Sequence, residues 1–174
     1  GFYNGFAYIN LKGKCNFINT EGELLSPNQW FDNISSIREG FAKVELNYKY
    51  NFINTEGRLL SPNQWFDSIG NFHEGFAGVK LNGKWNIINT EGQLLNPNQW
   101  FDDIGIFSKG VAIVELNGKW NIINTEGNLL SPNQWFDRIN NFHEGFASVV
   151  LNIKCNFINR EGQLLSPNQW FDNV

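Results

Sequence analysis

Apolar and polar residues alternate along short stretches that recur through the whole chain. In residues 76–81 (FAGVKL), apolar side chains occupy every second position, which is the pattern of a half-buried β-strand. Asn82-Gly83 follows directly and favours a tight hairpin turn, after which residues 84–89 (KWNIIN) form a second β-rich stretch. The pattern therefore predicts antiparallel hairpins rather than helices.

Two further β segments are expected after each hairpin. Residues 90–92 (TEG) have the composition of a turn, with the glycine at the position that needs a positive φ angle. Residues 93–95 (QLL) are expected to start a third strand, which Pro97 ends or confines to a sheet edge. Residues 97–107 are then expected to form a loop and a fourth short strand. The pattern thus predicts three or four short antiparallel strands in each unit.

This pattern repeats every 35 residues along the chain. Glycines at that spacing open five units, which are 5–39, 40–74, 75–109, 110–144 and 145–174. Residues 1–4 match the end of a preceding unit, so we expect a single repeat domain, 1–174, in which they complete the last unit. One unit cannot bury both of its faces alone, so neighbouring units must cover them.

Two all-β architectures fit five such units: a closed, five-bladed, propeller-like ring and an open β-solenoid. The chain begins at position 32 of the unit and ends at position 30, as a circuit completed by both termini would. The first and last units also keep the apolar residues that an open array would replace by polar ones. These features favour the ring, in which the units of Cys15 and Cys155 are neighbours, and they leave open whether those cysteines are bonded.

Composition narrows the class of partner. Aromatic residues make up 16% of the chain and charged residues 17%, with a net charge of -4. This balance argues against disorder and, because phosphate backbones require clusters of Lys and Arg, against nucleic acid as a partner. No apolar segment is long enough for membrane insertion, and no signal peptide is visible. The chain contains no Met, so we expect a processed product or a piece of a longer protein.

At the segments NGKWNIINTEG and PNQWFDDIGIFSKG the chain resembles the WG-repeat (KWG-repeat) family of bacterial proteins. The resemblance extends over all five units and implies tandem β units with surface or interaction roles and no catalytic residues. A cell-surface or secreted location is therefore favoured. The namesake Trp is present as Trp85 and Trp120, whereas the equivalent residues elsewhere are Tyr50, Cys15 and Cys155. The glycine that follows this Trp in the family is replaced here by Asn16, Asn51, Asn86, Asn121 and Asn156.

The motif PNQWFD occurs in every unit and supplies the candidate ligand-binding residues. They are Trp30, Asp32, Trp65, Asp67, Trp100, Asp102, Trp135, Asp137, Trp170 and Asp172. An indole beside amide and carboxylate groups can bind a sugar ring through stacking and hydrogen bonds, and equivalent sites would add avidity. Alternatively, the Trp and Phe side chains wedge between units, and the Asp and Asn side chains cap turns. Both interpretations are open at this stage.

No pattern of residues points to catalysis, a metal or a cofactor. His73 and His143 are the only histidines, and they lie in units that are not adjacent in the sequence. One glutamate in each TEG or REG turn falls short of the ligand density that calcium requires. Glycosidase chemistry needs two carboxylates in distinct environments, which identical repeats do not provide. We expect no catalytic residue, no metal and no cofactor, and a propeller-type hydrolase is only a remote alternative.

The sequence therefore predicts a non-catalytic, multivalent binding module whose ligand is a glycan or a protein, with self-association as a further option. A purely structural segment or spacer of a longer surface protein is the alternative. Positions four and six of the unit vary between copies, as Lys43 and Glu45 in the second unit illustrate. Because they alternate with the apolar positions, we expect them on one exposed sheet face, either as a partner-specific surface or as neutral drift.

Overall fold

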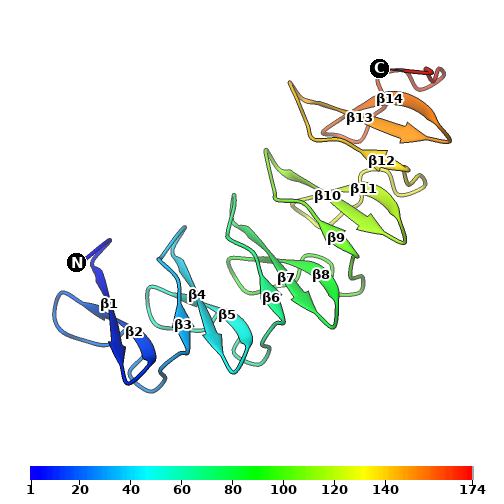
Figure 1. The fold of residues 1–174 in the computed structure, drawn as a ribbon. Coiled ribbons are helices and arrows are strands. Elements are labelled where there is room, and N and C mark those ends of the chain that lie inside the picture. The colour runs from blue at the N-terminus through cyan, green and yellow to red at the C-terminus, as the bar shows by residue number, and fades with distance from the viewer. Residues whose placement is uncertain (174) are drawn as a thin grey trace. The chain divides into compact units, whose positions relative to one another are not determined.

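The computed structural model describes residues 1–173, which form strands and turns and no helix. Long strands pair as hairpins along the chain (Figure 1). They are β1 (Phe6–Leu11), β2 (Lys14–Asn19), β4 (Phe41–Leu46), β5 (Lys49–Asn54), β7 (Phe76–Leu81), β8 (Lys84–Asn89), β10 (Val111–Leu116), β11 (Lys119–Asn124), β13 (Phe146–Leu151) and β14 (Lys154–Asn159). Short strands of two residues precede four of the hairpins, and these are β3 (Asn33–Ile34), β6 (Ser68–Ile69), β9 (Asp103–Ile104) and β12 (Arg138–Ile139).

These strands form five separate sheets, so the predicted all-β repeat fold is confirmed. The orders are β1-β2, β3-β4-β5, β6-β7-β8, β11-β10-β9 and β12-β13-β14. Each short strand pairs antiparallel with the hairpin that follows it, for example β3 with β4. A sheet therefore takes its first strand from one sequence unit and its hairpin from the next. Closure of the sheets into a ring, the single-domain description and the completion of the last unit by residues 1–4 stay predictions.

The third strand that we predicted in each unit is reduced to a single bridge, such as that between Ile53 and Leu59. Leu60 still donates its amide to the carbonyl of Phe52 at 2.8 Å. The next residue, Ser61, bonds the side chain of Asn51 instead of a neighbouring strand. The chain therefore leaves the sheet before Pro62. Units one to four still hold three strands each, such as β4, β5 and β6 in the second unit, which agrees with the predicted three or four.

Two-residue turns with positive φ angles join the strands. Asn82 and Gly83 have φ angles of 51° and 82°, as the predicted Asn-Gly hairpin turn requires. Glu74 and Gly75 have φ angles of 51° and 83°, so they form a second turn of the same kind. The flanking backbone bonds of 2.8 and 3.0 Å close this Glu-Gly turn, which the sequence did not lead us to expect. Both turns repeat along the chain and give each three-stranded sheet a meander topology.

By its contacts the chain divides into two compact units. The first contains Gly1–Gly83 and Ile87–Leu94, and the second contains Lys84–Asn86 and the chain from Leu95 onward. In the first unit, Phe31 and Val44 lie in the buried core, and in the second, Ile122 and Phe136 do so. Burial of each such side chain contributes about 1.5–3 kcal/mol, which is how successive repeats stabilise one another.

A glycine in the TEG or REG turn lies against the backbone of the preceding repeat. A Cβ atom added at Gly92 would stand 2.3 Å from the carbonyl oxygen of Leu60, and one at Gly162 would stand 2.4 Å from that of Leu130. Both glycines have a positive φ angle, as the turn prediction required. Gly22 has the same positive φ but no atom of this kind nearby. The later glycines therefore serve the contact between repeats as well as the turn.

Two further findings concern the cysteines and the membrane. Cys15 and Cys155 are both free thiols in the structure. Cys15 is buried and lies 2.8 Å from the hydroxyl oxygen of Tyr8, a contact that raises the pKa of that phenol. Across residues 1–173 we find no helix with the length and apolar character needed to cross a membrane.

Candidate binding grooves between repeats

The tryptophans of the PNQWFD motif are half-buried, and two of them pack against the preceding repeat. Trp170 lies with its ring centroid 6.5 Å from that of Phe136, which belongs to the preceding copy of the motif. Trp65 packs against the core cluster that contains Phe31, again one repeat earlier. The tryptophans with this half-buried character are Trp30, Trp65, Trp100, Trp135 and Trp170. This packing agrees with the wedge interpretation, and sugar binding at these residues stays a prediction.

The aspartates of the same motif connect two repeats. Asp67 pairs with Lys49 of its own repeat, and its Oδ2 accepts a 2.7 Å hydrogen bond from the amide of Asn82 in the next hairpin turn. The Lys49 ammonium, followed by that amide, holds the pKa of the carboxyl below its ordinary value. The same pairs of contacts occur at Asp32, Asp102 and Asp137. These carboxylates thus fix the spacing between hairpins.

Asp172 differs from the other four aspartates. It pairs with Lys154, but in the described part of the chain no turn amide reaches it. Its side chain is 90% exposed, compared with 32% for Asp67. The contact with a following hairpin is therefore what covers the carboxylate in the inner repeats.

A buried asparagine, which sequence reasoning did not identify as functional, holds the PNQ loop. Asn51 donates from Nδ2 to the carbonyl oxygens of Ser61 at 2.7 Å and Gln64 at 3.1 Å. Its Oδ1 accepts from the amides of Phe52 at 2.8 Å and Ser61 at 3.2 Å. The buried asparagines at this position are Asn16, Asn51, Asn86, Asn121 and Asn156. One feature of the sequence could have identified this residue: every unit carries Asn at the position where the WG-repeat pattern has glycine.

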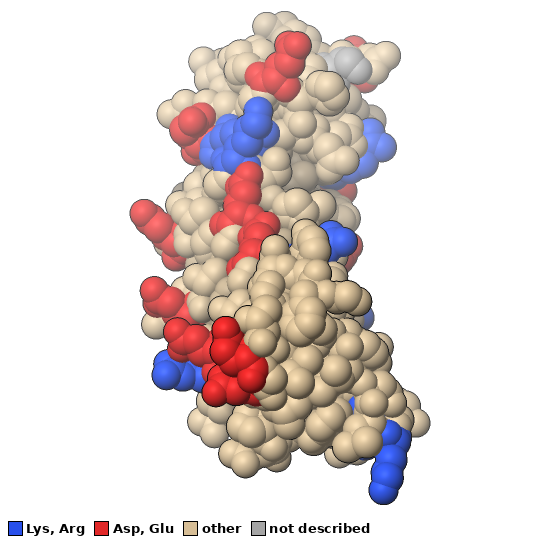
Figure 2. Space-filling model, turned by 90° about the vertical axis from the view of Figure 1, so that its left-hand side faces the viewer, with Lys and Arg blue, Asp and Glu red and all other residues tan. Residues whose placement is uncertain are grey.

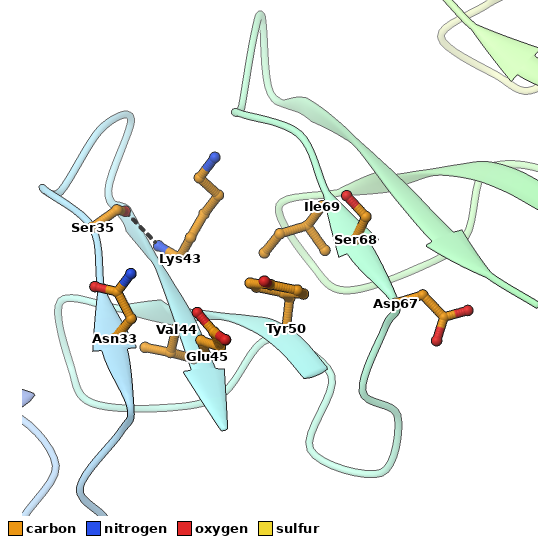
Figure 3. A pocket seen from close by; sticks show the side chains of 9 residues that line it. All are labelled: Asn33, Ser35, Lys43, Val44, Glu45, Tyr50, Asp67, Ser68 and Ile69. Atoms are coloured by element: carbon orange, nitrogen blue, oxygen red, sulfur yellow. Dashed lines mark hydrogen bonds between the residues drawn. The ribbon is translucent and has the colours of Figure 1, made fainter. Parts of the chain in front are cut away.

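A groove opens in the first compact unit between the sheet β3-β4-β5 and strand β6 of the next repeat. We name it groove A, and Figure 3 shows its side chains. Its volume is about 420 Å³. It is lined by Asn33, Ser35, Lys43, Val44, Glu45, Tyr50, Asp67, Ser68 and Ile69.

The centre of groove A combines one aromatic ring with two unpaired charges. Tyr50 faces Ile69 across the groove, and Glu45 lies beside the Tyr50 ring (Figure 3). Glu45 and Tyr50 are direct cross-strand partners of β4 and β5. Lys43 and Glu45 alternate on β4 with the buried Val44, and no ion pair forms at either charge within residues 1–173. Groove A can therefore offer an aromatic face, an ammonium group and a carboxylate to a ligand.

An equivalent groove in the second compact unit has a different lining. We name it groove B, and its volume is about 500 Å³. It is lined by Asp103, Ile104, Gly105, Ile106, Ser108, Val111, Ala112, Ile113, Trp120, Ile139, Asn141, Phe142 and Arg160. Trp120 stands at the repeat position of Tyr50, and Ile113 stands at that of Lys43. Groove B is thus mainly apolar, with Arg160 as its one lining cation among the described residues.

A third, smaller groove of about 240 Å³ lies near the N-terminus, where Tyr8 occupies the position of Lys43. The residue at this variable position lines the groove in all three cases. We predicted an exposed sheet face for these positions, but Lys43 and Ile113 are half-buried. The reason is that the following repeat covers one side of each sheet, so that a variable residue becomes the wall of a groove.

The described residues show no arrangement that identifies a reaction. His73 and His143 are both exposed. Within residues 1–173 no three His, Cys, Asp or Glu side chains gather as metal ligands would. No buried side-chain nitrogen or oxygen atom in that range lacks a hydrogen-bond partner. What the grooves offer chemically is recognition through aromatic, apolar and singly charged side chains.

Comparison with known proteins bears on the family and the fold. The family model described as "WG containing repeat" matches residues 17–50, 52–85, 101–120 and 122–155, which together make up more than half of the chain. This match confirms the resemblance drawn from the repeated motifs. No curated protein matches the chain.

Several solved structures resemble this chain at low identity. Kluyveromyces lactis Hsv2 is 8% identical, with 92% of this chain and 59% of that chain covered and a TM-score of 0.44. A protein of unknown function from Bacteroides caccae is 14% identical, with 97% and 78% covered and a TM-score of 0.31. A structure titled as the eukaryotic initiation factor is 15% identical, with 92% and 50% covered and a TM-score of 0.51. The chain spans about three fifths of the length of the Hsv2 structures, and the likeness to the initiation factor concerns the fold alone.

Proposed function

This chain belongs to the WG-repeat family, and from that premise we propose that it is a non-catalytic module that binds a protein partner through grooves A and B. The observation that carries the proposal is that the side chains lining the two grooves differ, whereas the buried residues around the grooves are the same in both repeats. Lys43 and Tyr50 in groove A correspond to Ile113 and Trp120 in groove B. A polypeptide, whose side chains differ along its length, matches such different grooves better than a polymer of one repeated unit.

The grooves are suited to weak individual contacts. Each is lined by one aromatic residue at the same repeat position, Tyr50 or Trp120, and aromatic residues are often found at the energetic centre of protein interfaces. A ligand that occupies two or more grooves gains affinity through the high effective concentration of the second site. Repetition of a modest groove therefore supports a multivalent binder.

The distribution of charge also favours a protein over a nucleic acid as the partner. On the face shown in Figure 2, acidic and basic side chains are interspersed and adjoin in several places, and the basic ones do not form one broad patch. The net charge of the chain is -4. Nucleic-acid binding draws most of its affinity from many Lys and Arg contacts to phosphates, which such a surface does not supply.

Glycan binding is the second candidate, and the lining of groove A favours it. The Tyr50 ring there lies among the hydroxyl or amide groups of Asn33, Ser35 and Ser68. An aromatic face beside hydroxyl and amide groups suits a sugar ring. Groove B has fewer polar than apolar lining residues, so groove A is the better candidate for a glycan.

Arrays of defined peptides and of glycans, probed with the labelled 174-residue chain, test these proposals. We expect a subset of peptides to bind and the selected subset to change in Lys43→Ile and in Ile113→Lys. Each of these variants carries the residue that the other groove already holds, so folding is preserved. Asn63→Ala, at an exposed loop position outside both grooves, serves as the control.

The array results separate the candidates. Peptide selection that changes with the lining supports the protein partner. Glycan binding that is lost in Tyr50→Ala supports the second candidate instead. Binding to neither array, by a chain shown to be folded, contradicts both and favours a purely structural role.

A further inference from the structure

Arg160 is the one residue of the second-turn motif that departs from the other repeats. The motif reads INREG in the last unit and INTEG in the others, where the same position holds Thr20, Thr55, Thr90 and Thr125. The substitution places a long, positively charged side chain at a position where the other four repeats carry threonine. Because Arg160 lines groove B, the change alters the chemistry of that groove.

Contacts within the second compact unit hold the Arg160 side chain in place. Its Nη1 donates a 2.8 Å hydrogen bond to the carbonyl oxygen of Ser108, and its guanidinium carbon lies 4.5 Å from the ring centroid of Phe142. No carboxylate within residues 1–173 forms an ion pair with it. A guanidinium carries five N–H donors in a planar fork, so most of them stay available to a ligand.

The negative charge in the groove lies at its other end. Asp103 is the register partner of Glu115, whereas Ser108, which binds Arg160, bridges Val111. Glu115 lies four positions along strand β10 from Val111, which corresponds to about 13 Å at 3.3 Å per residue. Asp103 therefore does not neutralise Arg160, and a carboxylate at the Arg160 end meets an unopposed positive charge.

The same end of groove B is apolar. Ile106 is 71% exposed, which is a high value for a large aliphatic residue, and it follows Gly105, whose amide donates a 2.7 Å hydrogen bond to the carbonyl oxygen of Ile113. Trp120 lines the other end of the groove, because its cross-strand partner is Glu115. Removing such side chains from water contributes about 25 cal/mol per Å² of buried area. The groove thus offers an apolar wall and an oriented guanidinium next to each other.

We infer that groove B recognises a peptide segment in which a bulky apolar side chain adjoins an acidic one. The apolar side chain lies against Ile106 and Ile113, and the carboxylate accepts hydrogen bonds from the Arg160 guanidinium. Charge-assisted pairs of this kind are stronger than neutral hydrogen bonds and favour Arg over Lys. This inference rests on the proposed peptide-binding function and names the class of segment that groove B selects.

Synthetic peptides test the inference. Fluorescein-labelled peptides containing Phe-Glu or Glu-Phe, flanked by Gly and Ser and amidated at the C-terminus, are compared with Phe-Gln, Phe-Lys and Gly-Glu counterparts. Fluorescence anisotropy with the full chain measures the affinities. We expect the Phe/Glu peptides to bind about tenfold more tightly than the Phe-Gln peptide, which is the effect of one charge-assisted hydrogen bond. In Arg160→Thr the advantage disappears, because Thr is the residue of the other repeats and leaves the fold unchanged.

A matched control and three possible outcomes decide whether groove B has this preference. Arg58→Thr removes the same charge from an exposed turn of the first compact unit, and it leaves the preference intact. Equal binding of Phe-Glu and Phe-Gln overturns the inference while the proposed function stands. Preference for a free C-terminal carboxylate over the amidated Phe-Glu peptide also overturns it. If no peptide in the arrays or in this set binds, the proposed function fails as well.

Discussion

Grooves A and B overlap in their place in the repeat, since five lining positions correspond, but they differ in character. Groove A presents Lys43, Glu45 and Tyr50, whereas groove B presents Ile113, Trp120 and Arg160. The frame around them is the same in both: a buried Phe, a buried Asn with four hydrogen bonds, and an Asp that reaches the next hairpin turn. The lining can therefore change without a change in the buried residues that surround it.

The separation of frame and lining follows from burial. Phe66 and Phe136 are almost fully buried, so a change in their volume disturbs the packed core. Lys43 and Ile113 are half-buried at a groove wall, where side chains of different size and charge both find room. The comparison predicts that substitutions of the buried residues around either groove lower the stability strongly and by equal amounts. Substitutions of the residues that line the grooves should change the stability little.

Loss of the buried asparagine is the strongest test of this comparison. In Asn51→Ala and Asn121→Ala, the loop groups that each amide binds lose their partners inside the protein. We expect each variant to lose about 3 kcal/mol of unfolding free energy, since buried polar groups left unpaired cost about 1–3 kcal/mol each. Urea unfolding followed by circular dichroism measures the loss.

The exposed residues Asn63 and Asn133 of the same loops supply the controls, and their replacement by Ala changes stability by about 0.5 kcal/mol or less. A loss at Asn51 that is several times the loss at Asn121 would show that the two frames are not equivalent. The comparison of the grooves would then lose its basis.

A second test addresses the contact between repeats at each groove. Gly92→Ala and Gly162→Ala place a methyl group against the carbonyl oxygens of Leu60 and Leu130. Gly22→Ala introduces the same strain at a positive φ but meets no neighbouring atom. We expect Gly92→Ala and Gly162→Ala to lose about 2 kcal/mol more stability than Gly22→Ala, because overpacking against backbone adds to the φ strain.

Thermal unfolding of the three glycine variants measures this difference. Equal losses in all three would mean that the turn alone needs glycine. The contact between repeats would then have no part in positioning the grooves.

Local chemistry predicted much of the fold. The Asn82-Gly83 turn, the alternating strand 76–81 and the positive φ angle at Gly92 all follow from residues that are neighbours in the sequence. The Glu74-Gly75 turn was missed because Glu is not a residue that favours a positive φ angle. The predicted third strand was too long because the Asn51 side chain, eight residues before Leu59, determines where the chain leaves the sheet.

The candidate site was less accessible to sequence reasoning. PNQWFD drew attention because of its Trp and Asp residues, but Trp170 packs on the preceding repeat and Asp67 holds the next hairpin. Groove A joins side chains from positions as far apart as Asn33 and Ile69, so it depends on how one repeat docks on another. Variation at Lys43 was visible in the sequence, but the cover that the next repeat gives it was not.

The aspartates provide the smallest expected effect and the finest test of whether the two frames match. The Lys49 ammonium lowers the pKa of Asp67, and the Lys119 ammonium lowers that of Asp137. A carboxyl whose pKa is lower in the folded state adds stability above its unfolded pKa, and this stability is lost as pH falls through the folded pKa. Asp67→Asn and Asp137→Asn keep an acceptor for the turn amide but lose the charge. We therefore expect both variants to unfold at slightly lower urea concentrations than the unmodified chain at pH 7, by similar amounts.

The difference should disappear below the folded pKa, where the unmodified carboxyl is also protonated. It should also shrink in high salt, because exposed ion pairs are screened. Asp172→Asn should show a smaller effect, since no turn amide binds its carboxylate and its side chain is 90% exposed. An effect of Asp172→Asn as large as that of Asp67→Asn would show that the lysine pair alone stabilises the repeat. The link to the next hairpin would then add nothing to the frame that both grooves share.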